Sequence, residues 1–194
     1  MECIDDKLNK IESVITEKSF KENKGLGNEV GYYVFDYNPK YELLVRNHIE
    51  YLKRKINSSN KGIKIVEFDL YKIMIDILKE EGFLEICFEK EKEEGFLEMA
   101  ESISECLGLD ETNELNLVLT RILESIPEED SVIFLTGVGK CYPIIRAHNI
   151  LNNMHQVFDT MPVMLFFPGN YSGLELDIFG TVSDNNYYRA FQFD

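Results

Sequence analysis

One segment, Ser131–Met154, constrains the fold of this 194-residue chain more than any other. It begins with a continuous apolar run, VIFLTG, passes through a glycine-containing turn, GVGK, and ends in a pattern typical of an amphipathic helix. A strand, a short loop and a helix in this order place ligands at the carboxyl end of a parallel sheet. Pro143 is expected near the helix start, where its fixed φ and missing N–H are tolerated. The segment therefore predicts an α/β fold.

The loop between this strand and helix resembles a phosphate-binding loop but lacks two of its four fixed residues. Such a loop needs a glycine five residues before its second glycine, and then Lys followed by Ser or Thr. Phe134 occupies the position of the first glycine, and Cys141 follows Lys140. The glycine that lets the backbone wrap phosphate and the hydroxyl that binds Mg²⁺ are both missing. We therefore expect that this loop does not act as an NTPase site.

The rest of the chain supplies the other elements of an α/β fold. Runs rich in β-branched and aromatic residues predict three further strands, at Tyr32–Tyr37, Ile63–Asp69 and Pro162–Gly169. Apolar stripes at helical spacing predict four helices. Two are expected over Asp5–Lys18 and Tyr142–Phe158, one starts at Asn38-Pro39 with an apolar stripe from Tyr41 to Ile56, and one has its apolar stripe from Leu70 to Leu78. Asp69 is a good N-cap for the helix with the stripe from Leu70 to Leu78.

Two further features complete the predicted architecture. The segments ELDIFGTV and YYRAFQF, joined by the turn SDNN, predict an antiparallel hairpin near the C-terminus. The acidic stretch 85–129 is expected to form a helical insertion between the second and third strands. We predict a single α/β domain over residues 1–194, a three-layer sandwich with a mostly parallel sheet, a nucleotide-binding-like topology and a C-terminal antiparallel hairpin.

The charge is unevenly distributed along the chain. Residues 1–92 hold 16 Lys and Arg against 18 Asp and Glu, whereas the remainder holds 4 against 17. Direct, non-specific DNA binding is not expected, because a duplex-binding face needs clustered basic residues. Acidity is also an ordinary source of solubility. With no apolar run of about 18 residues and no signal-peptide core at the N-terminus, a cytoplasmic location without membrane contact is expected.

Cysteine and histidine spacing gives no support for a metal site. The four cysteines show neither CxxC spacing nor pairing with histidine, and reduced structural thiols are the expected state. Cys141 at a helix N-terminus beside Lys140 would have a lowered thiol pKa. His148 and His155 share a helix face, but a zinc site needs further ligands, so packing or surface roles are the simpler interpretation.

Five segments in a fixed order carry a family resemblance. They are GLGNEVGYYVFDYNP at Gly25–Pro39, GIKIVEFDLY at Gly62–Tyr71, TGVG-x-x-YP-x-x-R-x-H-x-x-LNN at Thr136–Asn153, P-V-x-LFFPG-x-Y-x-G-x-x-L-x-x-FG at Pro162–Gly180 and DNNYYRAF at Asp184–Phe191. Together they resemble the BrxB family of the BREX phage-defence systems. The BrxB family has no established enzymatic activity or cofactor, so the resemblance implies neither for this chain. It implies a role in a multi-protein assembly of BREX components, with the alkaline-phosphatase-like protein PglZ as the expected direct partner.

Residues with polar, aromatic or cationic side chains in these segments are candidates for binding a partner or ligand: Asn28, Glu29, Lys140, Tyr142, Arg146, His148, Asn153, Asn185, Tyr187 and Arg189. Tyr and Arg are enriched at binding hot spots. A structural turn is the simpler interpretation of the glycine-flanked Asn28 and Glu29, and sheet packing explains Tyr187 and Arg189 equally well. No catalytic residue and no metal ligand is predicted.

The favoured interpretation is a non-enzymatic adaptor within a BREX-type complex. Two alternatives stay open at this stage. One is a divergent NTPase that uses the Thr136–Cys141 loop, with Glu67 or Asp69 near a metal. The other is a small-molecule or nucleic-acid sensor at the same end of the sheet.

Overall fold

The computed structural model describes residues 3–17, 20, 31–59, 61–111, 114–128, 130–180, 182–184 and 190–193. The chain divides into two compact units. The first unit comprises Met1–Glu67, Pro127–Thr136 and Asp159–Asp194, and the second comprises Phe68–Ile126 and Gly137–Phe158. The expectation of a single domain stays a prediction.

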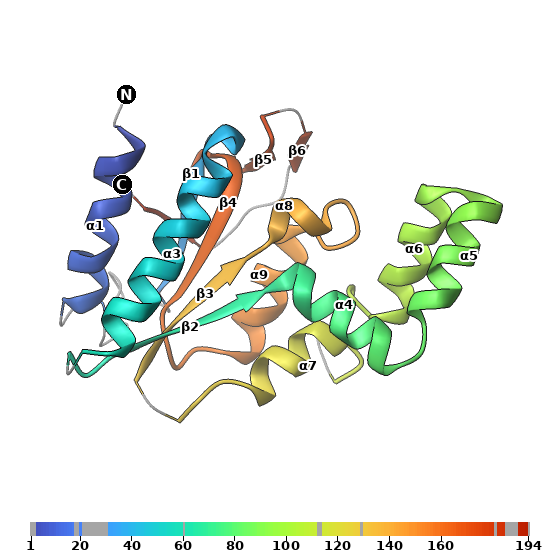
Figure 1. Ribbon diagram of the computed structural model, residues 1–194, viewed down its shortest axis with the longest axis horizontal. Helices are drawn as coiled ribbons and strands as arrows, with labels where there is room; N and C mark the ends of the chain where they lie inside the picture. The colour runs from blue at the N-terminus through green and yellow to red at the C-terminus, as the bar shows by residue number, and fades with distance from the viewer. Residues whose placement is uncertain are drawn as a thin grey trace. The chain divides into compact units, whose positions relative to one another are not determined.

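A mostly parallel sheet forms the centre of the first unit (Figure 1). In the described part of the chain the strands are β1 (Tyr32–Tyr37), β2 (Lys64–Asp69), β3 (Ser131–Thr136), β4 (Val163–Tyr171), β5 (Leu176–Ile178), β6 (Val182–Asp184) and β7 (Phe191–Gln192). Their order is β2-β3-β4-β1-β7, with β5 on β4 and β6 on β5. The pairs β1–β4, β3–β4 and β1–β7 are parallel, and β4–β5 and β5–β6 are antiparallel.

The continuous apolar runs of the sequence become the central strands. Every side chain of β3 is buried, as is every side chain of β4 except Asn170. Phe35 on β1 and Phe134 on β3 lie on either side of Phe166 on β4, with ring centroids 5.3 and 4.9 Å from that of Phe166. Three neighbouring strands thus present one aromatic face.

Two helices cover this aromatic face. They are α1 (Ile4–Thr16) and α3 (Glu42–Asn57), which lie side by side on the sheet in Figure 1. Their buried stripes are Leu8, Ile11 and Ile15 on α1, and Val45, Ile49, Leu52 and Ile56 on α3. A short 3₁₀ turn, Pro39–Tyr41, leads into α3, and the Asn38 side chain accepts a hydrogen bond from the Lys40 backbone N–H at its start.

The second unit is helical. Its helices, all within described segments, are α4 (Leu70–Glu80), α5 (Leu84–Glu94), α6 (Phe96–Cys106), α7 (Leu117–Glu124), α8 (Val138–Cys141) and α9 (Ala147–Val157). Asp69 caps α4 by accepting hydrogen bonds from the backbone N–H groups of Tyr71 and Lys72, as its position predicted. Gly95, at φ +97°, separates α5 from α6, and only glycine adopts this conformation readily. The helices α5 and α6 run alongside each other (Figure 1).

Two local predictions were wrong. The helix expected over Tyr142–Phe158 starts later than expected: α8 ends at Cys141, Tyr142 is extended, and α9 starts at Ala147. Pro143 explains the break, because a proline disfavours helical geometry in the residue before it. Pro143 therefore lies between two helices and not near a helix start.

The second error concerns the strands of the C-terminal hairpin. The antiparallel hairpin exists, but it joins β5 to β6 through Phe179 and Gly180, both of which have positive φ. Ser183 and Asp184, expected in the turn, belong to β6, and the last strand, β7, pairs in parallel with β1.

The predicted fold class is confirmed by this architecture. The chain is a mixed α/β protein with a mostly parallel sheet and short strands at its C-terminal end. The acidic stretch after β2 contains the helices α5, α6 and α7. No helix within the described residues combines the length and apolarity that a membrane span requires.

Candidate functional site

The loop that resembles a phosphate-binding loop is already occupied by a carboxylate of the same unit. Gly137 has φ +80°, and a Cβ added there would lie 2.3 Å from Oδ1 of Asp69. The Asp69 carboxylate also forms an ion pair with Lys140. Lys140, which in a phosphate-binding loop would face a phosphate, thus faces an internal carboxylate that also caps α4.

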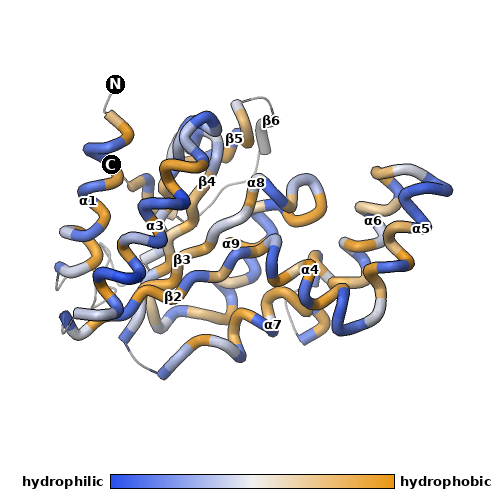
Figure 2. Tube along the Cα trace, viewed as in Figure 1, coloured by the Kyte–Doolittle hydropathy of each residue, from blue (hydrophilic) through white to orange (hydrophobic). Residues whose placement is uncertain are grey.

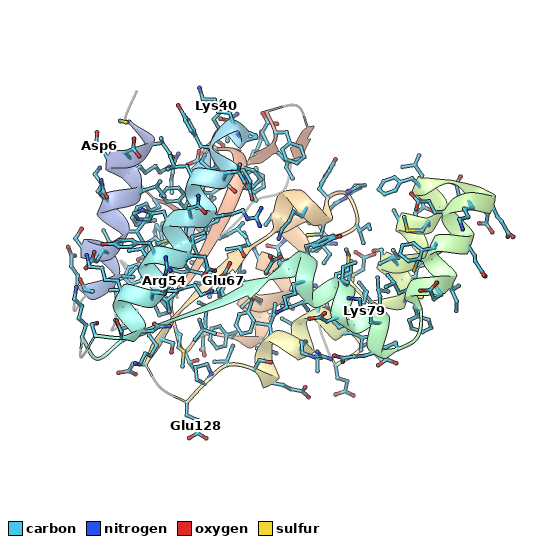
Figure 3. All side chains as sticks on the ribbon, in the orientation of Figure 1. Asp6, Lys40, Arg54, Glu67, Lys79 and Glu128 are labelled. Carbon is cyan, nitrogen blue, oxygen red and sulfur yellow. The ribbon has the colours of Figure 1, made fainter. Side chains whose placement is uncertain are left out.

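Glu67, the second carboxylate considered for a metal, is also paired. Its Oε1 accepts a hydrogen bond from Thr136 Oγ1 at 2.7 Å, and its other oxygen accepts one from Lys53 Nζ on α3. Burial alone would lower the pKa of Lys53, but hydrogen bonds from its ammonium group to Glu67 and Glu50 raise it. The charge on Glu67 is therefore balanced within the first unit, beside α3, where Figure 3 labels it.

Cys141 does not have the reactive character that its position suggested. It is the last residue of α8 and not the first, and its Sγ donates to the carbonyl oxygens of Gly137 and Val138. Burial, together with the nearby Asp69 carboxylate, raises the pKa of this thiol to about 12. The expected lowering of its pKa was wrong because desolvation of a buried thiolate outweighs the attraction of Lys140.

An apolar groove lies between α4, α5, α6 and the segment Lys140–Ile144. It has a volume of about 220 Å³. Its lining is mainly apolar and aromatic: Tyr71, Met74, Ile75, Leu78, Leu84, Cys87, Phe88, Glu91, Phe96, Met99, Ile103, Lys140, Cys141, Tyr142 and Ile144. Two predicted site residues, Lys140 and Tyr142, are among them. We refer to this feature as the apolar groove.

A polar cleft lies on the other face of α6. It has a volume of about 390 Å³, and Arg146 and His148 line it together with Glu101, Ser104 and Asp110. Asn149, also in the lining, donates a hydrogen bond to Asp110 Oδ1 at 3.0 Å. No three His, Cys, Asp or Glu side chains gather as metal ligands would in the part of the chain that the structure describes.

Asn153 serves the interior of the second unit. Its side-chain amide is buried and donates to the carbonyl oxygens of Leu109 and Glu111, at 3.2 and 3.1 Å. Asn116 donates to the same two carbonyl groups and accepts from the Leu119 backbone N–H, which caps α7. The two asparagines hold one loop between α6 and α7.

The structure thus separates the predicted site residues. Lys140 and Tyr142 line the apolar groove, Arg146 and His148 line the polar cleft, and Asn153 is buried. The other candidates lie outside the described residues: Asn28, Glu29, Asn185, Tyr187 and Arg189.

The exposed apolar residues of α5 and α6 were not predicted from the sequence. Ile86 and Phe88 on α5 are 57% and 47% exposed, and Phe96 and Leu97 on α6 are 45% and 67% exposed. One signal was available, because Ile86 and Phe88 are two residues apart and lie on different sides of a helix. The apolar residues of α5 therefore cannot all be buried on a single face of the helix.

These observations define an α/β protein whose phosphate-loop-like turn is occupied by its own aspartate and whose helical unit exposes an apolar groove. Comparison with known proteins identifies the family. Residues 66–193 match the family model described as BREX protein BrxB, so the chain belongs to the BrxB family and has a role in a BREX defence system. The resemblance inferred from the five sequence segments is confirmed.

Two curated relatives agree with this assignment. The chain is 47% identical to the BREX protein BrxB of Bacillus cereus (strain H3081.97) over 192 residues, which cover 99% of this chain and 98% of the relative. It is 32% identical to the BREX protein BrxB of Escherichia coli O9:H4 (strain HS) over 186 residues, which cover 96% and 89% of the two chains. No solved structure matches the chain.

Proposed function

We propose that this protein is a non-enzymatic adaptor of a BREX defence complex that acts in the cytoplasm and binds a PglZ-like protein directly. The observation that carries the adaptor role is the apolar groove with its exposed rim. PglZ enters the proposal through the family resemblance, and other BREX components are further partners in the same assembly.

The exposed rim of the groove supports a docking role. Tyr71, Phe88 and Phe96 line the groove and are each more than one third exposed. Soluble monomers rarely expose large contiguous apolar patches without a binding function. Aromatic side chains are also enriched at the energetic centres of protein interfaces. The groove therefore has the composition of a partner-binding surface.

The interactions of the ionisable groups support an adaptor over an NTPase. A catalytic carboxylate must be available to a metal or to a water molecule. Glu67 is instead bonded to Thr136 and Lys53, and Asp69 to Lys140 and the start of α4. A nucleophilic cysteine needs a thiolate, and the raised pKa keeps Cys141 protonated.

Co-purification tests the proposed function. We expect the tagged protein, co-expressed with BREX components that include a PglZ-like protein, to retain the PglZ-like protein at a stoichiometric ratio through gel filtration. Phe88→Ser is expected to release that partner, whereas Leu43→Ser, at a 69%-exposed position on α3, is expected to retain it. Absence of PglZ from the purified wild-type complex would contradict the proposed partner, and retention of no BREX component would contradict the adaptor role.

The polar cleft favours a second candidate, a small-molecule sensor. It is larger than the apolar groove and brings Arg146, His148 and Glu101 together. Calorimetric titration with nucleotides, with and without Mg²⁺, tests this candidate. Saturable binding that Arg146→Ala removes would favour the sensor, and the absence of heat at millimolar ligand would count against nucleotide sensing.

A further inference from the structure

Helices α5 and α6 present apolar side chains that the fold does not bury. None of the side chains of α5, all of which the structure describes, is buried. Figure 3 shows many side chains projecting outward from both helices. Ile86 and Phe88 of α5 are exposed, and their exposure needs an explanation other than packing within this unit.

The apolar residues of α5 and α6 are spaced so that one face of each helix lines the apolar groove. On α5 the lining residues Leu84, Cys87, Phe88 and Glu91 lie at i, i+3, i+4 and i+7. On α6, Phe96 and Met99 continue the apolar surface. An apolar cavity of roughly 150 Å³ accommodates a benzene-sized group. The groove, at about 220 Å³, is large enough for one aromatic or branched aliphatic side chain.

The charge on the helices beside the groove determines which residues a bound segment can carry next to that side chain. Helices α5 and α6 together carry eight Glu and two Lys. Lys90 is paired with Glu94 at 3.3 Å, and Lys140 in the groove lining is paired with Asp69. Glu91, which also lines the groove, is exposed. The hydrophilic end of α5 is visible in Figure 2. The groove is therefore mainly apolar, Glu91 lies in its lining, and the two helices α5 and α6 beside it carry an excess of Glu over Lys.

We infer, on the basis of the proposed adaptor function, that the apolar groove binds a basic amphipathic segment of the partner protein. One large apolar side chain of that segment fills the groove, and Lys or Arg residues on either side of it lie against the glutamates of α5 and α6. Electrostatic complementarity of this kind sets the specificity and the association rate of an interface more than its affinity. Nucleic acid and anionic lipid surfaces are repelled by the same glutamates.

Synthetic peptides provide the test with the full-length protein. The first peptide is a fluorescein-labelled amphipathic helix of about 18 residues with Leu and Phe at i, i+3, i+4 and i+7 and Lys elsewhere. Two matched peptides replace all Lys with Glu, or all Leu and Phe with Ser. Fluorescence anisotropy is expected to show saturable binding of the first peptide only, with the other two at least tenfold weaker.

Matched protein variants locate the binding site. Phe88→Ser and Glu91→Lys are each expected to weaken binding of the first peptide at least fivefold. The controls are Leu43→Ser, which also removes an exposed apolar side chain but on α3, and Glu128→Lys, an equal change of charge at an exposed position in the other unit. Both controls are expected to bind as the wild type does. Circular dichroism melting must show that all four variants are folded.

Several outcomes would overturn this inference. Equal binding of the Lys and Glu peptides would remove the charge argument, and equal loss in the control variants would show that the peptide binds elsewhere. Concentration-dependent dimerisation in sedimentation equilibrium, abolished by Phe88→Ser, would make a second copy of the chain the occupant. If PglZ still co-purifies with the Phe88→Ser protein, this inference fails and the adaptor role stands. If the first peptide binds as expected but no BREX component co-purifies, the adaptor role fails instead.

Discussion

Replacing Gly137 by Ala tests the close approach of Asp69 to the loop between β3 and α8. Gly137 has φ +80°, and its added Cβ would lie 2.3 Å from Asp69 Oδ1 and 3.2 Å from the Tyr71 backbone nitrogen. Ordinary side chains do not pack at 2.3 Å, so the Asp69 carboxylate must move away. It would then lose its hydrogen bonds to the N-terminus of α4 and its ion pair with Lys140.

The expected loss of stability has three parts. A non-glycine residue in the left-handed region costs about 1–2 kcal/mol. Loss of the Asp69 N-cap costs about 1 kcal/mol. The ion pair, whose side chains are about one third exposed, contributes less than about 1 kcal/mol. Gly137→Ala is therefore expected to lower the free energy of unfolding by about 2–4 kcal/mol.

Gly82→Ala is the matched control for this substitution. Gly82 belongs to the same unit and has φ +75°, but its added Cβ would meet no atom within 4 Å. Urea unfolding followed by circular dichroism should show a loss of about 1–2 kcal/mol for Gly82→Ala, from backbone strain alone. In an Asp69→Ala background the difference between the two glycine variants should shrink, because the colliding carboxylate is gone. Equal losses in the wild-type background would refute the reasoning.

Three other predictions concern chemistry, nucleic acid and pH. The purified protein is expected not to hydrolyse ATP, and turnover that Lys140→Ala abolishes would contradict this. It should not bind duplex DNA near physiological salt at a net charge of −15, as gel-shift titration can check; sub-micromolar, salt-sensitive binding would contradict this. Burial lowers the pKa of His48, whose Nε2 has no hydrogen-bond partner among the residues that the structure describes. The pKa of His48 is lower in the folded state than in the unfolded state, so its protonation favours unfolding. Neutral His48 therefore supports the full stability above about pH 6.5, and this stability is lost as the pH falls further. His48→Gln should flatten the wild-type decline in stability between about pH 7 and pH 5.5; parallel curves for the two proteins would contradict this.

The sequence predicted the elements of the fold better than their arrangement. Buried strands such as β3 are continuous apolar runs, and α3 has a buried stripe from Val45 to Ile56, so their local patterns carry a strong signal. The order β3-β4-β1 depends on pairing between segments that are far apart in the chain. A period of two residues along a strand indicates which side chains share a face but not which strand lies beside it.

The residues of the candidate site were predicted less well for a related reason. Asp69 was correctly identified as a helix cap because capping depends on residues only two or three positions away. Its approach to Gly137 joins residues 68 positions apart, and no local pattern encodes it. Phe88 and Phe96 resemble core residues in the sequence, and only the packing of α4, α5 and α6 shows that they border a groove. The break after Cys141, in contrast, could have been predicted from Pro143.

Hydrogen–deuterium exchange of the protein with and without the purified PglZ-like partner tests the central claim most directly, because it locates the docking surface without any substitution. We predict slower exchange on partner addition in peptides that cover α5, α6 and the segment Lys140–Ile144, whose residues line the apolar groove. Peptides covering the exposed face of α3 should exchange at unchanged rates. Protection confined to α3 or to other parts of the first unit, or no protection at a saturating concentration of the partner, would contradict the claim that this protein is an adaptor that binds its partner through the groove.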